Sequence, residues 1–167
     1  MILALDLSTK STGWAVYDGA KLIDHGCQIA TSTILINRIQ KIVGELDEKI
    51  FQKYNITKVI AEEVQPTGGW GVGNQKTHKA LMWMQAAVAF LIHDKYAAAD
   101  LCFIYPSSWR SDCGIKTGRG VKREVLKERD IQFVKEKFGI LVNDDEADAI
   151  GIGYSEACKH SNETNFS

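Results

Sequence analysis

Apolar and polar positions divide the first thirty residues into short extended segments. Residues 2–8 contain an apolar run that is too short for a helix and too apolar for a loop, so they predict a buried strand. Residues 14–17 predict a second strand, which ends at the hairpin signal Asp18 and Gly19, and residues 21–29 predict a third. We therefore expect the chain to begin with an antiparallel meander of three strands.

The pattern changes to a helical period after this meander. Apolar residues recur three and four positions apart from Ile34 to Phe51, with charged residues between them, which predicts an amphipathic helix ending near Tyr54. Residues 58–64 predict a fourth strand. Because a helix joins this strand to the meander, a right-handed crossover would make it parallel to a meander strand.

The rest of the chain is expected to alternate loops with helices. The expected elements are a loop over 65–74, a helix over 75–96, a strand over 101–105 that Pro106 stops, a loop over 107–120, and helices over 121–138 and 145–159. Small residues in the 75–96 helix favour close packing in the core, with a subunit interface as the alternative. We expect a single domain over residues 1–160 and a polar, disordered tail over 161–167.

Length, charge and cysteine content narrow the class of protein. A chain of 167 residues suits one domain with a core of its own. A net charge of -1 excludes a basic field over the whole surface, so any contact with DNA must come from a local patch. The cysteines lack metal-binding spacing and indicate reduced thiols in a cytoplasmic protein. No signal peptide is recognised, and no apolar run approaches the roughly 18 residues of a membrane span.

One basic stretch interrupts this neutral chain, between residues 110 and 129. Its cations could form a solvated helix face with ion pairs four residues apart, which is what we expect for Lys127 and Arg129. Others flank a glycine-rich turn at a helix start, where phosphate binding is favourable. The residues expected to contact phosphate are Lys116, Arg119, Lys122 and Arg123.

Carboxylates recur at three points of the predicted fold. Asp6 lies in the first strand, where burial is costly unless the residue is paired or binds a metal; the alternative is that it hydrogen-bonds the next turn. Glu62 and Glu63 end the fourth strand. Asp145 and Asp148 lie on one face of the last helix, where they could simply stabilise the helix dipole. The apolar residues after them indicate a buried helix, so we expect Asp148 to point inward or into a cleft.

Packed side by side, these carboxylates would raise one another's pKa. Divalent cations remove the conflict, and Mg²⁺ and Mn²⁺ prefer hard oxygen ligands. Two such ions, roughly 3.5–4 Å apart, can activate a water and stabilise the leaving oxygen in phosphodiester cleavage. The order of the acids along the chain therefore favours a metal-dependent hydrolase.

The pattern of elements and acids resembles the RNase H-like fold, an α/β fold with a mixed five-stranded sheet (an antiparallel three-strand meander plus two parallel strands) flanked by helices. Within it, the chain resembles RuvC-type Holliday-junction resolvases, particularly the short phage-encoded relatives. The resemblance rests on residues 2–8 with 12–16, on 60–64 and on 145–151. It implies a homodimer that resolves four-way DNA junctions by paired symmetric nicks, with two Mg²⁺ or Mn²⁺ ions per active site and no small-molecule cofactor. It also implies a cytoplasmic protein, in the bacterial host if the chain is phage-encoded.

The resemblance also assigns the acids. Asp6, Glu62, Asp145 and Asp148 match the catalytic, metal-binding carboxylates of the family. Strand alternation puts Glu62 and Glu63 on opposite faces, so only one can join Asp6, and the match favours Glu62.

The DNA-binding residues of the family have matches as well. Lys116 and Lys122 lie where the family has DNA-binding lysines, with Arg119 and Arg123 beside them. Trp70 could match the aromatic residue that wedges into the junction, because an exposed ring can stack on unpaired bases.

Other functions are compatible with parts of the sequence. Asp6 to Gly13 could be the phosphate loop of a sugar-kinase or actin-like (ASKHA-type) nucleotide-binding protein, although 167 residues leave little space for a second lobe. A module that binds junctions without cutting would lack an acid, and each expected acid is present. A YqgF-type nuclease that acts on other nucleic acid would have the same fold.

Overall fold

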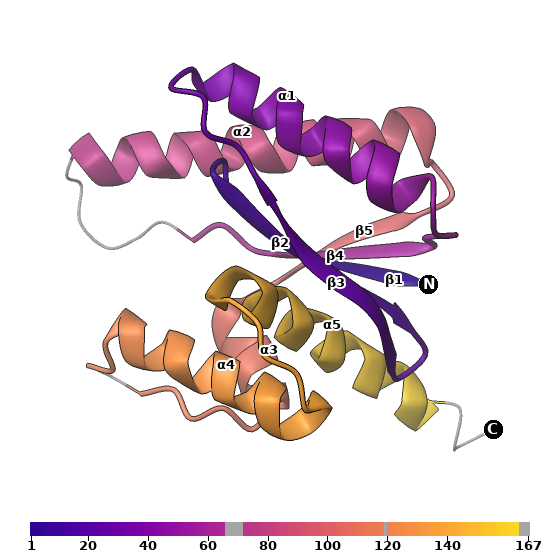
Figure 1. Ribbon diagram of the computed structural model, residues 1–167, viewed down its shortest axis with the longest axis vertical. Helices are drawn as coiled ribbons and strands as arrows, with labels where there is room; N and C mark the ends of the chain where they lie inside the picture. Colours follow the sequence, from indigo (N-terminus) through magenta and orange to yellow (C-terminus); the bar gives the residue numbers. More distant parts are fainter. Residues whose placement is uncertain (66–71, 119, 164–167) are drawn as a thin grey trace.

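A five-stranded sheet with the strand order β3-β2-β1-β4-β5 forms the centre of the structure, which is a computed structural model (Figure 1). β1 (Ile2–Asp6), β2 (Ser11–Asp18) and β3 (Lys21–Ile29) pair antiparallel, which confirms the predicted meander. β1 is the central strand, and its burial on both faces agrees with its nearly continuous apolar run.

Two parallel strands extend the sheet on the other side of β1. β4 (Lys58–Glu62) pairs with β1, and β5 (Asp100–Ile104) pairs with β4. In this register Leu5 lies opposite Ala61, so the last residues of β1 and β4 are neighbours. The mixed α/β sheet is therefore the one that the sequence predicts.

The structure describes residues 1–65, 72–118 and 120–163. Two predicted DNA-contacting residues, Trp70 and Arg119, lie outside these ranges. Helix α5 continues to Glu163, into the segment expected to be a tail, and residues 164–167 are again outside the described part. Among the described helices, none combines the length and the apolar character that crossing a lipid bilayer requires.

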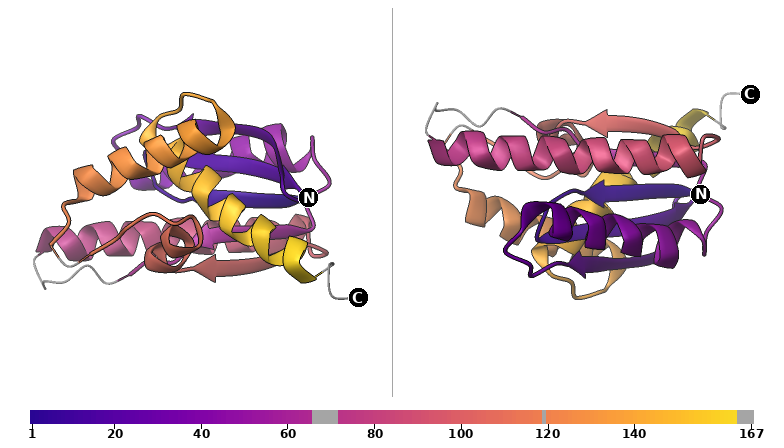
Figure 2. Two further views of the ribbon diagram at one scale, coloured as in Figure 1. Left: turned by 90° about the horizontal axis from the view of Figure 1, so that it is seen from below. Right: turned by 90° about the horizontal axis from the view of Figure 1, so that it is seen from above.

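Two helices cover one face of the sheet (Figure 1; Figure 2, right). α1 (Leu35–Leu46) runs directly into a single π-helical turn, η1 (Asp47–Phe51), and α2 (Val72–Lys95) packs beside it. The apolar stripe of α1 faces the sheet, as its periodicity predicts. The large side chains buried in this layer include Leu3, Leu5, Val16, Ile42, Leu46, Ile50, Val59 and Met84.

Three helices cover the opposite face (Figure 2, left). They are α3 (Pro106–Asp112), α4 (Arg123–Phe138) and α5 (Asp144–Glu163). The prediction of a loop over 107–120 is wrong in its first part, because α3 occupies it. Pro106 at the first helical position presets the backbone angle, and the fully buried Trp109 ring anchors this short helix in the core.

Helix α5 lies unusually close to the sheet because glycines line the contact. A Cβ atom on Gly13 would lie 1.9 Å from the carbonyl oxygen of Asp145, and one on Gly153 would lie 2.4 Å from the ring of Tyr17. The Tyr17 hydroxyl donates a hydrogen bond to the carbonyl oxygen of Ile150 at 2.8 Å. These contacts fix the start of α5, and with it both acids of its first turns, over β1 and β2.

Candidate active site

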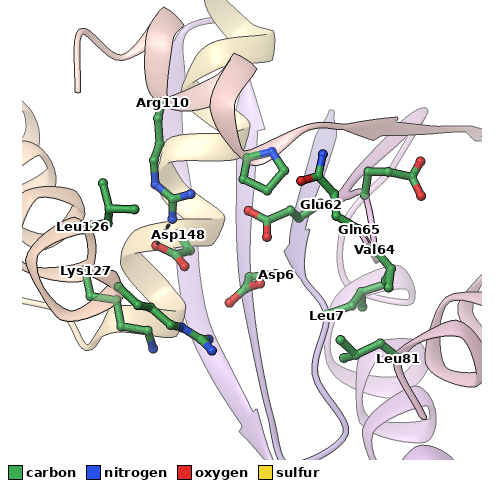
Figure 3. A pocket seen from close by; sticks show the side chains of 13 residues that line it. Asp6, Leu7, Glu62, Val64, Gln65, Leu81, Arg110, Leu126, Lys127 and Asp148 are labelled. Carbon is green, nitrogen blue, oxygen red and sulfur yellow. Dashed lines mark ion pairs between the residues drawn. The ribbon is translucent and has the colours of Figure 1, made fainter. Parts of the chain in front are cut away.

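The acids predicted on β1, β4 and α5 meet at one end of the sheet. Asp6 is the last residue of β1 and Glu62 the last of β4, so the parallel pairing of these strands brings the two carboxylates together. Asp148 reaches the same place from α5. All three line a pocket of about 330 Å³, and Figure 3 shows them around a common space.

The pKa values show how strongly these carboxylates interact. Removal from water raises the pKa of Asp6 to about 8, and the charges of Glu62 and Asp145 add to the effect. Removal from water also raises the pKa of Asp148 to about 9, with Asp6 and Asp130 contributing. The same desolvation raises the pKa of Glu62. Nearby cations therefore do not balance the charge of the fully ionised cluster.

Asp145, the fourth predicted acid, lies beside this pocket rather than in its lining. Its Oδ2 accepts a hydrogen bond from the Ser11 hydroxyl, which also contacts the Cys27 thiol at 3.0 Å. Asp145 still raises the pKa of Asp6, so the two carboxylates are electrostatic neighbours. The structure thus brings together three of the predicted acids. It places the fourth next to them, where Asp145 accepts a hydrogen bond from the Ser11 hydroxyl of β2.

Glu63 also lines the pocket, but it lies beyond the end of β4 and its backbone N–H donates to the carbonyl oxygen of Ile104 at 2.8 Å. Desolvation is the main cause of the raised pKa of Asp6, and the charge of Glu62 adds to it. The local geometry thus agrees with the choice of Glu62, which the match to the family favours.

Cations form the opposite wall of the pocket. Arg110, Arg123 and Lys127 line it, and Lys127 also forms an ion pair with Asp144. The expectation that Lys127 belongs to a solvated helix face is therefore wrong. The N-terminal part of α4 turns this lysine toward the carboxylates, and its charge lowers the pKa of Asp6.

The other predicted DNA-contacting residues have different surroundings. Lys122 is exposed at the N-cap of α4, next to Arg123. Lys116 is also exposed, but it borders a separate pocket that Arg129 and Phe133 line as well. The Arg129 guanidinium donates to the carbonyl oxygen of Lys116. Among the predicted DNA-contacting residues that the structure describes, Lys122 and Arg123 are the two that lie at the start of α4, and Arg123 lines the acidic pocket.

Comparison with known proteins identifies the fold. No family model and no curated protein matches the sequence. The structure is similar to Thermus thermophilus RuvC in complex with a Holliday junction substrate, with a TM-score of 0.73 over 96% of this chain and 94% of that chain at 14% identity. A second structure of Thermus thermophilus RuvC gives 0.71 over 98% and 96% at 15% identity. The chain has the RuvC-type fold.

A third similar structure is the yeast mitochondrial Holliday junction resolvase, with a TM-score of 0.58 over 95% of this chain and 80% of that chain at 15% identity. The structural comparison finds similar proteins and the sequence comparison finds none, because a fold can persist at 14–15% sequence identity. The RNase H-like architecture predicted from the order of strands and acids is thereby confirmed.

Within the RuvC-type fold, α3 contributes two residues that the sequence did not single out. Trp109 Nε1 donates a hydrogen bond to Glu62 Oε2 at 2.8 Å. Arg110 Nη2 donates to Asp130 Oδ2 at 2.8 Å and lies 3.6 Å from Asp148 Oδ1. Pro106 at the start of α3 is a helix-start signal. However, nothing in the spacing of residues along the sequence predicts that this helix contacts the acids.

The oxygen donors of the pocket suit a hard divalent cation. Asp148 Oδ1 is buried and has no hydrogen-bond partner among the described residues, which is uncommon for a carboxylate oxygen unless it binds an ion or water. In the described part of the chain, no three His, Cys, Asp or Glu side chains are already drawn together as a metal cluster.

Proposed function

We propose that the protein is a metal-dependent, structure-selective DNA endonuclease that resolves four-way (Holliday) junctions and related branched DNA by paired symmetric nicks. The observation that carries this proposal is the meeting of Asp6, Glu62 and Asp148 in one pocket of a RuvC-type fold. One of the similar structures is RuvC in complex with a Holliday junction substrate, which supports branched DNA as the substrate of this chain.

In this proposal Asp6, Glu62 and Asp148 hold Mg²⁺ or Mn²⁺, with Asp145 as the neighbouring fourth ligand. When bound, two such ions activate a water and stabilise the leaving oxygen of the phosphodiester. The raised pKa values of Asp6 and Asp148 support the assignment, because such acids are held together without sufficient neutralising charge. Ser11 orients Asp145 through its hydroxyl.

The protein groups on the opposite wall have a different task. Arg123 and Lys127 would bind the phosphates of the strand to be cut, because they face the acids across the pocket. Lys122 at the start of α4 would bind a neighbouring phosphate. Lys116, Arg119 and Trp70 stay predicted DNA contacts.

Paired nicks require two active sites, so a homodimer belongs to this proposal. The protein would act on its substrate in the cytoplasm, which is the cytoplasm of the bacterial host if the chain is phage-encoded.

A nicking assay tests the proposal. The wild-type protein is incubated with a synthetic four-way junction, a flap, a linear duplex and an RNA substrate, each with Mg²⁺, with Mn²⁺ and with EDTA. We expect symmetric nicks in the junction that depend on the metal. Equal cutting of the duplex would instead indicate a general nuclease, preferential cutting of RNA a YqgF-type activity, and tight binding without cutting a junction-binding module.

A further inference from the structure

Helix α3 touches the acidic pocket from outside through a fully buried tryptophan. The Trp109 ring has no exposed surface, and its Nε1 donates to Glu62 Oε2 at 2.8 Å. Gly151 of α5 makes room for this ring, because a Cβ atom there would lie 2.5 Å from Trp109 Cζ3. The fold thus fixes this indole N–H between β4 and α5, where it holds one oxygen of Glu62.

The next residue of α3 reaches a second acid. Arg110 forms two parallel bonds with the fully buried Asp130 of α4, from Nε to Oδ1 at 3.2 Å and from Nη2 to Oδ2 at 2.8 Å. The guanidinium carbon lies 4.2 Å from the centre of the Trp109 ring, so the two side chains stack. Figure 3 shows the guanidinium directed at Asp148.

The distance from Arg110 Nη2 to Asp148 Oδ1 is 3.6 Å, which is too long for a hydrogen bond. Asp130 already binds two donors of the guanidinium. Arg110 therefore attracts Asp148 electrostatically while Oδ1 keeps its lone pairs. In the same way, Trp109 binds one oxygen of Glu62 and leaves the other, Oε1, without that bond.

We propose that Trp109 and Arg110 are positioning residues, which orient Glu62 and Asp148 so that one oxygen of each is presented to a divalent cation. The inference rests on the proposed function and deepens it, since it names the groups that support the metal ligands. Outer-shell hydrogen bonds of this kind fix the orientation of ligands, and their loss typically lowers metal affinity or activity about 10- to 100-fold.

The test compares Mn²⁺ binding by the wild-type chain and by Trp109→Phe, which keeps an aromatic ring but removes the N–H donor. Isothermal titration calorimetry on the folded protein, without DNA, measures the dissociation constant. We expect an increase of about 10-fold or more. Trp83→Phe, at an exposed position of α2, is the matched control and should bind Mn²⁺ like the wild type.

A second variant tests Arg110 separately. Arg110→Lys keeps the positive charge but loses the planar fork that grips Asp130. We expect weaker Mn²⁺ binding here too, measured by the same titration without DNA. Junction binding in EDTA should be unchanged in Trp109→Phe, because Trp109 does not line the pocket. Raising the Mn²⁺ concentration should restore much of the cleavage rate of Trp109→Phe, which a merely misfolded chain would not show.

The outcomes separate this inference from the proposed function. If the wild type neither binds Mn²⁺ nor cuts a junction, the proposed function is wrong and the inference is wrong with it. If the wild type does both and the two variants bind Mn²⁺ with the wild-type dissociation constant, only the positioning role is overturned.

Discussion

Asp6 has a pKa far above that of an ordinary aspartate. Removal from water and the charges of Glu62 and Asp145 raise its pKa to about 8. In the unfolded chain an aspartate has a pKa of about 3.9. Between these two values the folded state binds a proton that the unfolded state releases, so folding becomes less favourable as the pH rises. Asp148, with its pKa raised to about 9, acts in the same direction.

We therefore expect the stability of the metal-free protein to fall as the pH rises from 5 to 8, whereas Asp6→Asn should flatten this dependence. Thermal unfolding in EDTA at several pH values measures it. Asp18→Asn, at an exposed acid of β2, is the control and should keep the wild-type slope. A wild-type stability that stays constant or rises over this range would contradict the raised pKa values.

Glu62 and Glu63 offer a comparison between adjacent acids. Glu62→Gln should reduce junction cleavage by at least about 100-fold, since it alters the carboxylate next to Asp6. Glu63→Gln should have a much smaller effect, because that residue lies beyond β4. Cleavage rates at saturating Mg²⁺ measure the difference, and a filter-binding assay in EDTA checks that both variants still bind the junction. Equal losses would remove the distinction between the two residues.

For single residues, the sequence predicted the acids of the site better than it predicted the side chains that contact them. Asp6 and Glu62 could be found because each ends an apolar strand, and strand ends meet across a sheet. The position of Lys127 against the acids depends on how α4 packs, and the bond from Trp109 to Glu62 depends on α3 lying beside β4. Neither leaves a periodic signal along the chain.

Among the elements, α5 most directly determines the geometry of the pocket, because its first turns carry Asp145 and Asp148. Gly13 of β2 permits the close approach of this helix. Gly44, in the interior of α1, has no atom within 4 Å of a Cβ built on it. These two glycines therefore allow a matched pair of substitutions.

Gly13→Ala should destabilise the protein by about 1–3 kcal/mol, because the new methyl group would collide with the backbone of Asp145. Gly44→Ala should stabilise it by about 0.5–1 kcal/mol, since alanine loses less backbone entropy in a helix. Urea unfolding measures both free energies. A Gly13→Ala chain as stable as the wild type would show that α5 can shift away from β2 without cost.

The element that the sequence missed is also the shortest α-helix among the described residues. α3 has seven residues, which is too few for a helical period, and its polar composition resembles that of a loop. Its stability comes from the burial of Trp109 rather than from its own sequence pattern. Helix α1 and the strands of the meander were predictable because each carries an apolar pattern of sufficient length.

For the whole molecule, the sheet separates two layers of different character. α1 and α2 cover one face and α3, α4 and α5 the other (Figure 1). The helices of the second layer contribute Arg110, Arg123, Lys127 and Asp148 to the pocket. DNA should therefore approach from the side of α4. Since the net charge of the chain is -1, the proposed affinity for DNA would have to come from this local patch rather than from the total charge.

Neutralising Lys122 and Arg123 together should weaken junction binding and reduce the slope of log affinity against log salt concentration by about two, because each phosphate contact contributes about 0.9. Fluorescence anisotropy over a range of salt concentrations measures the slope. Neutralising Lys41 and Lys49, two cations that pair with Glu45 in the opposite layer, is the control and should leave the slope unchanged. If only the control pair changed the slope, the DNA surface would lie on the face of α1.

The order in which the pocket's components appear in the chain has a consequence for synthesis. Asp6 and Glu62 come from early strands, as does Gly13 of β2, but Asp148 comes with α5, the last element of the chain. A nascent chain on the ribosome can thus form much of the sheet while the acidic pocket still lacks one wall. If the proposed function is correct, we expect fragments truncated before α5 to be unable to cut DNA, because they lack Asp148.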